Sequence, residues 1–132
     1  MSNRLTHIDT EGNSKMVDVV EKKHSHRIAI AEGWVLLSDH ALSLISENRT
    51  QKGDVLQVAQ LAGIMASKRT SEIIPLCHPI PIDGVTVELQ IHLGKGVHIS
   101  SQVQNFWKTG VEMEALMAVS AAALTIYDMV KA

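Results

Sequence analysis

The sequence predicts an α+β domain in which an antiparallel sheet packs against helices. Between residues 85 and 103, apolar and polar side chains alternate on both sides of a Gly94-Lys95-Gly96 turn, which is typical of a β-hairpin with one covered face. The segment from Lys108 to Lys131 is long, apolar and free of Pro, which predicts a helix. A strand and two shorter helices precede the hairpin, and this order favours a sheet with helices on one side.

Composition favours one domain preceded by an arm. The chain has 132 residues, enough for one hydrophobic core but short for two. Residues 1–25 are polar and lack periodicity except at Met16-Val17-Asp18-Val19. We therefore expect a loosely held N-terminal arm over residues 1–25 and a single α+β domain over residues 26–132.

The first elements are predicted from strand and capping signals. A strand begins at Arg27, and Gly33 suggests a bulge or bend within it. Ser38 or Asp39 can cap a short helix that ends near Asn48. A second helix, ending at Lys68-Arg69-Thr70, is expected to have Asp54 as its cap and an apolar face formed by Val55, Val58, Leu61, Ala62 and Met65.

All three prolines lie between Pro75 and Pro81. Proline lacks an amide donor and biases the preceding residue toward extended geometry, so residues 73–81 cannot form an ordinary helix or central strand. We expect a stiff extended loop that presents Cys77 and His78.

The last helix carries the acids with the clearest positional signals. Thr109 and Glu112 have the spacing of a capping box, and Glu114 in the first turn suits the helix dipole. Asp128, in the last turn, opposes that dipole and meets Lys131 at i+3. Glu114 and Asp128 are 14 positions apart, or roughly 21 Å, so they cannot share one small substrate within one copy of the helix. Because most of the helix is too apolar to face water, we expect it to be buried, often against another subunit.

Composition also argues against several classes of protein. Net charge is −2, with 12 basic and 14 acidic residues, and aromatic content is 3%, so neither a basic field nor stacking platforms indicate nucleic-acid binding. Cys77 is the single cysteine, which excludes an internal disulfide and suits a reducing compartment. The N-terminus lacks the apolar core of a signal peptide, and no run approaches the ~18 residues of a membrane span. We expect a cytoplasmic protein with no membrane partner.

Cations gather at the ends of the predicted elements. Together with His78 and the acids, they form a set suited to holding a polyphosphate and moving protons on its organic part. Taken singly, a lysine is more often solvated surface, and lysines at helix ends also suit the dipole. A zinc site is weakly supported, because Cys77 and His78 are adjacent and no second Cys exists. The cations are Arg27, Lys52, Lys68, Arg69, Lys108 and Lys131.

Several stretches, in order, resemble the cyclic pyranopterin monophosphate synthase family of molybdenum cofactor biosynthesis. The resemblance covers nearly the whole chain. The matching stretches are Leu5-Thr6-His7-Ile8, Met16-Val17-Asp18-Val19, Lys52-Gly53-Asp54-Val55, Ala62-Gly63-Ile64, Lys68-Arg69-Thr70, Ile74-Pro75-Leu76-Cys77-His78-Pro79, Lys108-Thr109-Gly110-Val111-Glu112-Met113-Glu114-Ala115-Leu116 and Ala122-Ala123-Leu124-Thr125-Ile126-Tyr127-Asp128-Met129.

The resemblance implies a ferredoxin-like sandwich that assembles into a homohexamer, a trimer of dimers, with active sites between subunits. It also implies a lyase that rearranges a cyclic dihydroguanosine triphosphate to the pyranopterin and releases diphosphate. Asp128, Lys131 and Lys52 match the catalytic residues of the family. No resident cofactor is implied, with Mg²⁺ accompanying the triphosphate as the alternative. Residues on substrate-binding stretches, or matching further polar site residues, are Leu76, Cys77, His78, Met113, Glu114, Glu112, Lys68 and Arg27.

The chain departs from the family pattern at three places. Members usually continue past Lys131 with a segment rich in Gly, Lys and Ser, which would add a closing strand and a basic loop near the phosphates. Val130 stands where Cys is common, and Phe106-Trp107 is bulkier than expected. Two rival functions are a noncatalytic oligomeric module that binds nucleotides and a zinc-dependent hydrolase of the GTP ring.

Overall fold

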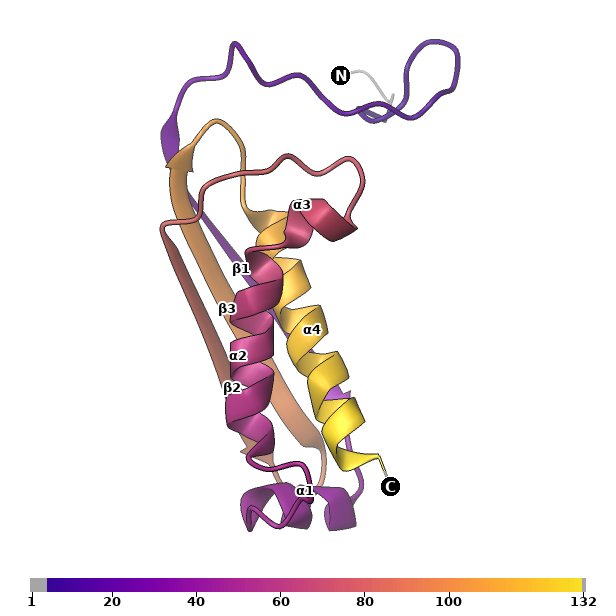
Figure 1. Ribbon diagram of the computed structural model, residues 1–132, viewed down its shortest axis with the longest axis vertical. Coiled ribbons are helices and arrows are strands. Elements are labelled where there is room, and N and C mark those ends of the chain that lie inside the picture. The colour runs from indigo at the N-terminus through magenta and orange to yellow at the C-terminus, as the bar shows by residue number, and fades with distance from the viewer. Residues whose placement is uncertain (1–4, 132) are drawn as a thin grey trace.

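The computed structural model describes residues 5–131 and confirms the α+β class. Three strands form one antiparallel sheet in the order β1-β3-β2, and α2 and α4 lie side by side over one of its faces (Figure 1). The elements are β1 (Ser25–Leu36), α1 (Asp39–Ser46), α2 (Val55–Ser67), α3 (Thr70–Ile73), β2 (Gly84–His92), β3 (Gly96–Trp107) and α4 (Glu112–Val130).

The sheet follows the predicted hairpin but corrects the expected bulge. β2 and β3 are joined through the predicted Gly94-Lys95-Gly96 turn. The pairing of β1 with β3 runs without interruption from Ser25 opposite Trp107 to Leu36 opposite Gly96, so Gly33 forms no bulge, and that alternative of the prediction was wrong. Glycine at position 33 instead allows β1 to pack closely against α4, because a Cβ there would lie 3.0 Å from Cγ1 of Val119.

Both short-range caps form as predicted. The Oγ of Ser38 accepts a hydrogen bond from the Ala41 amide at 3.1 Å, and Oδ1 of Asp54 accepts one from the Gln57 amide at 3.2 Å. The predicted apolar face of α2 was wrong in part, because three of its members, Val58, Leu61 and Met65, are exposed. The buried face of α2 consists mostly of small residues, Val55, Ala59, Gly63 and Ser67, which allow the close approach of α4.

The predicted capping box of the last helix does not form. Helix α4 begins at Glu112, with Val111 in the cap position and no side-chain cap, and Thr109 lies before it. Val111 is 1% exposed, so burial of an apolar side chain rather than a hydroxyl cap fixes the start of the helix. The carboxylate of Glu112 instead lies over Gly110, where a Cβ would collide with it.

Helix α4 is the centre of the hydrophobic core. Over its 19 residues it is long and apolar enough to cross a membrane, so the expectation that no segment approaches this length was wrong. It packs against α2, β1 and β3, however, and the central helix of a folded core meets the same criteria. Its buried residues are Glu114, Ala115, Ala118, Val119, Ala122, Ile126 and Met129.

The close contact between α2 and α4 predicts the effect of Gly63→Ala. A Cβ at Gly63 would lie 2.9 Å from the carbonyl oxygen of Ala118 and 3.3 Å from Cγ2 of Val87. Alanine favours a helix by about 1 kcal/mol over glycine, but overpacking a tight core costs about 1 to 3 kcal/mol. We expect a net loss of stability, measured as a lower Tm in thermal unfolding. Gln57→Ala, on the exposed side of α2, is the control; an equal or higher Tm for Gly63→Ala would contradict the packing argument.

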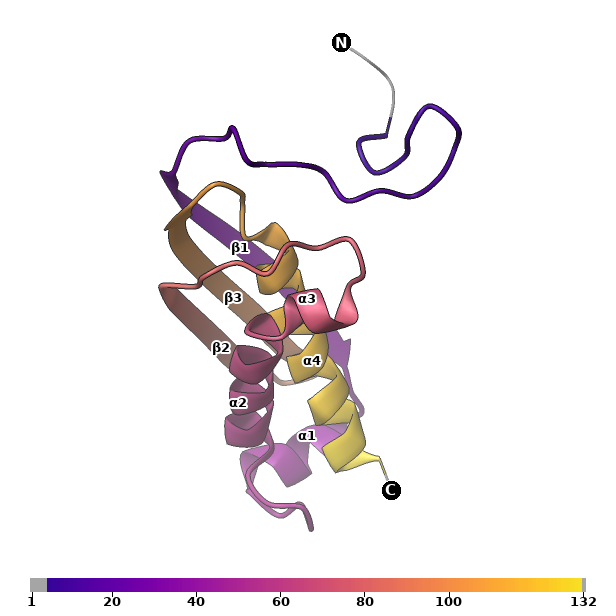
Figure 2. The same cartoon turned by 45° about the horizontal axis from the view of Figure 1, so that its top comes forward.

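The N-terminal arm crosses one end of the domain. Figure 2 shows residues 5–24 passing over the end at which α4 begins and α3 lies. Part of the arm is more ordered than expected, since Ile8 and Ser14 pair in an antiparallel bridge. The C-terminal end of α4 lies at the opposite end of the domain, beside α1 (Figure 1).

Candidate functional site

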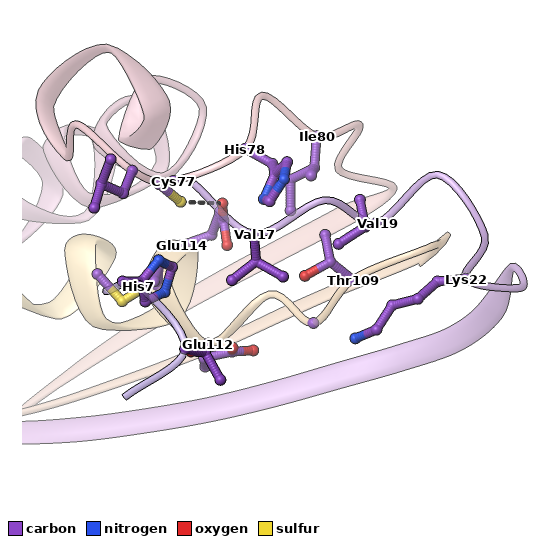
Figure 3. Close-up of a pocket in the computed structure, with 14 residues that line it drawn as sticks. His7, Val17, Val19, Lys22, Cys77, His78, Ile80, Thr109, Glu112 and Glu114 are labelled. Carbon is purple, nitrogen blue, oxygen red and sulfur yellow. Dashed lines mark hydrogen bonds between the residues drawn. The ribbon is translucent and has the colours of Figure 1, made fainter. Parts of the chain in front are cut away.

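A pocket of about 290 Å³ lies where α4 begins, between the proline-rich loop and the arm (Figure 3). Six of the predicted substrate-binding residues line it: Leu76, Cys77, His78, Glu112, Met113 and Glu114. The structure therefore brings together two stretches that are separated by more than thirty positions. The remaining lining residues are Thr6, His7, Val17, Val19, Lys22, Ile80, Thr109 and Gly110.

The proline-rich loop is held rigidly at its far end. After the short helix α3, which includes Ile73 and was not predicted, residues 74–83 form neither helix nor strand, as expected. Asn105, 1% exposed, donates a hydrogen bond from Nδ2 to the Pro81 carbonyl at 3.1 Å. Asp83 accepts from the Phe106 amide at 2.9 Å. These contacts with β3 hold the loop beside α4.

Cys77 and Glu114 form the innermost polar pair of the pocket. The thiol of Cys77 donates to Oε1 of Glu114 at 3.7 Å, and Glu114 is only 3% exposed. Burial raises the pKa of Glu114 above its ordinary value, and the negative charge of Glu112 adds to this effect. Burial, followed by the charge of Glu114, raises the pKa of Cys77 to about 11. At neutral pH Cys77 is therefore a protonated hydrogen-bond donor rather than a nucleophile.

This pair predicts how Cys77 reacts with an alkylating agent. Because only the thiolate reacts, alkylation of Cys77 by iodoacetamide should be slow at pH 7 and accelerate as the pH rises toward 11. Glu114→Gln removes the nearby negative charge, lowers the pKa of Cys77 and should speed alkylation at a fixed pH. The rate is followed by mass spectrometry of the intact protein. A rate for Glu114→Gln equal to that of the parent protein would show that the carboxylate does not influence the thiol.

A second cluster lies at the other end of α4. The ammonium of Lys52 donates to Oδ2 and to the backbone carbonyl of Asp128, each at 3.0 Å, and Lys131 Nζ lies 3.1 Å from Oδ1 of Asp128. These two lysines, first Lys52 and then Lys131, lower the pKa of Asp128. All three side chains are about half exposed. The i+3 pairing of Asp128 with Lys131 was predicted from spacing, whereas the approach of Lys52 required the fold.

Two of the predicted residues belong to neither cluster. Arg27 donates from Nε to the Trp107 carbonyl and from Nη2 to the Lys108 carbonyl, both at 3.2 Å, so it braces the connection between β3 and α4. Lys68 lines a separate depression together with Asp83 and Gly84. Ile80 lines both this depression and the main pocket. Neither Arg27 nor Lys68 lines the main pocket.

The arm residues were missed as site residues. Only the short Met16-Val17-Asp18-Val19 pattern indicated order there, and nothing local shows which surface such a segment contacts. Within residues 5–131, no group of three or more His, Cys, Asp or Glu side chains has the arrangement of a metal site.

Comparison with known proteins agrees with the resemblance. A model of the MoaC family matches residues 16–132. The chain is 53% identical to the cyclic pyranopterin monophosphate synthase of Thermomicrobium roseum, over 97% of this chain and 78% of the relative. It is 55% identical to that of Cereibacter sphaeroides, over 97% and 81%, and 48% identical to that of Brevibacillus brevis, over 100% and 82%. The chain therefore belongs to the MoaC family.

Proposed function

We propose that this chain is a cyclic pyranopterin monophosphate synthase. This lyase converts (8S)-3',8-cyclo-7,8-dihydroguanosine 5'-triphosphate to cyclic pyranopterin monophosphate and diphosphate. The observation that carries the proposal is the Lys52-Asp128-Lys131 cluster in a chain about half identical, over nearly its full length, to proteins of this name. The ammonium groups of Lys52 and Lys131, held by the carboxylate of Asp128, are groups that can donate protons in a rearrangement that depends on proton transfer.

The separation of the two clusters supports an active site between subunits. Glu114 and Asp128 are at opposite ends of α4, roughly 21 Å apart along its axis, so one compact substrate reaches both only if two chains contribute. Exposed apolar side chains give such chains surfaces to bury: Ile28, Ile30 and Leu36 on β1, Leu61 and Met65 on α2, and Leu116, Leu124 and Tyr127 on α4. We infer a homohexamer, a trimer of dimers, built on ferredoxin-like sandwiches.

We propose the following roles within the site. Asp128 holds both ammonium groups, and the adjacent carboxylate suits Lys131 to donating a proton. Lys52 is the second proton-transferring group. The carboxylates of Glu112 and Glu114 can accept hydrogen bonds from the N–H groups of the guanine-derived ring. His78, Lys68 and Arg27 would serve the triphosphate, while Leu76, Cys77 and Met113 shape the ring pocket.

The proposal includes no resident cofactor, and any Mg²⁺ would enter as a counterion of the triphosphate. It also places the protein in the cytoplasm, with neither nucleic acid nor membrane as a partner. The related proteins named above are bacterial enzymes, and α4, the one apolar helix of membrane-spanning length in the described chain, belongs to the core.

The direct test is turnover. The purified protein is incubated with the cyclic triphosphate, and the pyranopterin and diphosphate are measured by mass spectrometry and a coupled diphosphate assay. We expect both products in equal amounts, and activity that survives a zinc chelator. Binding without either product would instead indicate a noncatalytic nucleotide-binding module, and loss of activity with the chelator would favour the zinc hydrolase.

A further inference from the structure

Two separate stretches of the N-terminal arm form one side of the main pocket. Thr6, His7, Val17, Val19 and Lys22 are the arm residues that line the pocket. In Figure 3, His7 is drawn on the side of Cys77 and Glu114, and Lys22 on the side of Thr109. The half-buried residues Val17 and Val19 alternate with the exposed residues Met16, Asp18 and Val20. This period of two shows that the segment is extended and lays one face on the domain.

The arm has its own internal contacts. Oδ1 of Asp9 accepts hydrogen bonds from the amides of Glu11 and Asn13, at 2.9 and 2.8 Å. The Lys15 amide donates to the His7 carbonyl at 2.8 Å, which closes the turn at the tip of the arm. These bonds fix the geometry of the turn that carries His7.

The root of the arm is held on the domain by aromatic stacking. The ring of His24 stacks on Trp107, with centroids 4.7 Å apart and planes inclined by 17°. The rings of Phe106 and His24 form a T-shaped contact, with centroids 6.1 Å apart. The pair Phe106-Trp107 thus positions the segment that carries Lys22, two residues before His24.

The charges of the pocket give Lys22 a specific place. Among the described residues that line the pocket, Lys22 is the one Lys or Arg. The acidic residues that line it are Glu112 and Glu114. None of the four ion pairs found within residues 5–131 involves Lys22. Its side chain reaches from the arm toward Thr109, along the rim of the pocket (Figure 3). An anionic ligand that enters here has this ammonium available without breaking an existing pair.

We propose that the arm is a structural wall of the substrate pocket and that Lys22 is a substrate-contact residue, binding phosphate oxygens of the triphosphate. This rests on the proposed function for the identity of the substrate. The ring lies against Glu114 and Cys77, and the phosphates extend along the rim toward Lys22. The pocket thereby acquires a cation that the proline-rich loop and α4 do not supply within it.

The test compares two neighbouring lysines. Lys22→Gln removes the ammonium that lines the pocket, and Lys23→Gln makes the same charge change at an exposed position that does not line it. Loss of one charge-assisted phosphate contact should raise KM for the cyclic triphosphate about 10- to 100-fold. Turnover at saturation should stay within about twofold, because the contact is equally strong in the ground and transition states. Lys23→Gln should leave KM unchanged, and Lys22→Arg should restore most of the affinity.

Equal KM values for Lys22→Gln and Lys23→Gln would overturn the proposal, as would a fall in turnover with KM unchanged. Inorganic triphosphate provides a probe that does not depend on the proposed reaction. Calorimetry should show weaker binding of this anion to Lys22→Gln than to Lys23→Gln. If the parent protein binds inorganic triphosphate through Lys22 but converts no cyclic substrate, the proposed function fails while the anion site stands. If turnover of the cyclic substrate is normal and neither variant weakens binding, the proposed function stands and the proposed anion site at Lys22 fails.

Discussion

Asp128→Asn should lower turnover of the cyclic triphosphate at saturation by about 10²- to 10⁴-fold, the range typical of losing general acid-base catalysis. The carboxylate of Asp128 lies 3.0 Å from the Lys52 ammonium and 3.1 Å from that of Lys131, and it neutralises part of their charge. Asparagine keeps the shape of the side chain but not the charge, so the two ammonium groups repel each other and lose their fixed positions. KM should change far less than turnover, because the ring and phosphate contacts lie at the other cluster.

Protein stability provides the control for this variant. Asp128 opposes the dipole of α4, and its ion pairs are half exposed, so its charge contributes little to folding. Asp128→Asn should therefore unfold at nearly the same temperature as the parent. Asp39→Asn, which changes an exposed acid in the first turn of α1, should retain full turnover. Undiminished turnover of Asp128→Asn with unchanged binding would remove Asp128 from the catalytic group.

Local signals predicted those parts of the fold that depend on few residues. Ser38 and Asp54 cap their helices as expected, because a cap requires only one side chain and the amide three residues later. The capping box at Thr109 satisfied the same local rule and failed, because burial of Val111 sets the start of α4. The predicted bulge at Gly33 is absent for a similar reason, since glycine at this position allows close packing against Val119 of α4, which is distant in the sequence.

The site was predictable to the extent that its residues lie in ordered motifs. Spacing alone paired Asp128 with Lys131 and separated both from Glu114. The contribution of the arm could not be predicted in this way, because Lys22 reaches the pocket only through contacts between segments far apart in the sequence. The buried face of α2 was also predicted incorrectly from the spacing of its large apolar residues. The small residues Ala59 and Gly63 are buried, while larger apolar residues of the helix are exposed.

A mixture of two inactive variants should recover activity if the site is shared between subunits. Lys52 lies against Asp128 at one end of α4, and Glu114 is buried at the other end, so the two lesions fall in different halves of the site. When Lys52→Ala and Glu114→Ala chains are unfolded together and reassembled, random pairing should leave about a quarter of the sites with both halves intact. Each variant alone has no intact site.

The recovered turnover should approach about a quarter of the parent value per site, measured with saturating substrate after native mass spectrometry has shown mixed assemblies. Lys52→Ala mixed with Asp128→Asn is the matched control. Both of these lesions lie in the same half, whose side chains touch at 3.0 Å, so every site contains a damaged half and no activity should return. Mixed assemblies that stay inactive for Lys52 and Glu114 would place both clusters in the contribution of one chain. Recovery in the control pair would instead contradict the assignment of Lys52 and Asp128 to the same half of a site. Recovery confined to the first pair would place Glu114 and the Lys52-Asp128-Lys131 cluster around one substrate, bridged by two subunits.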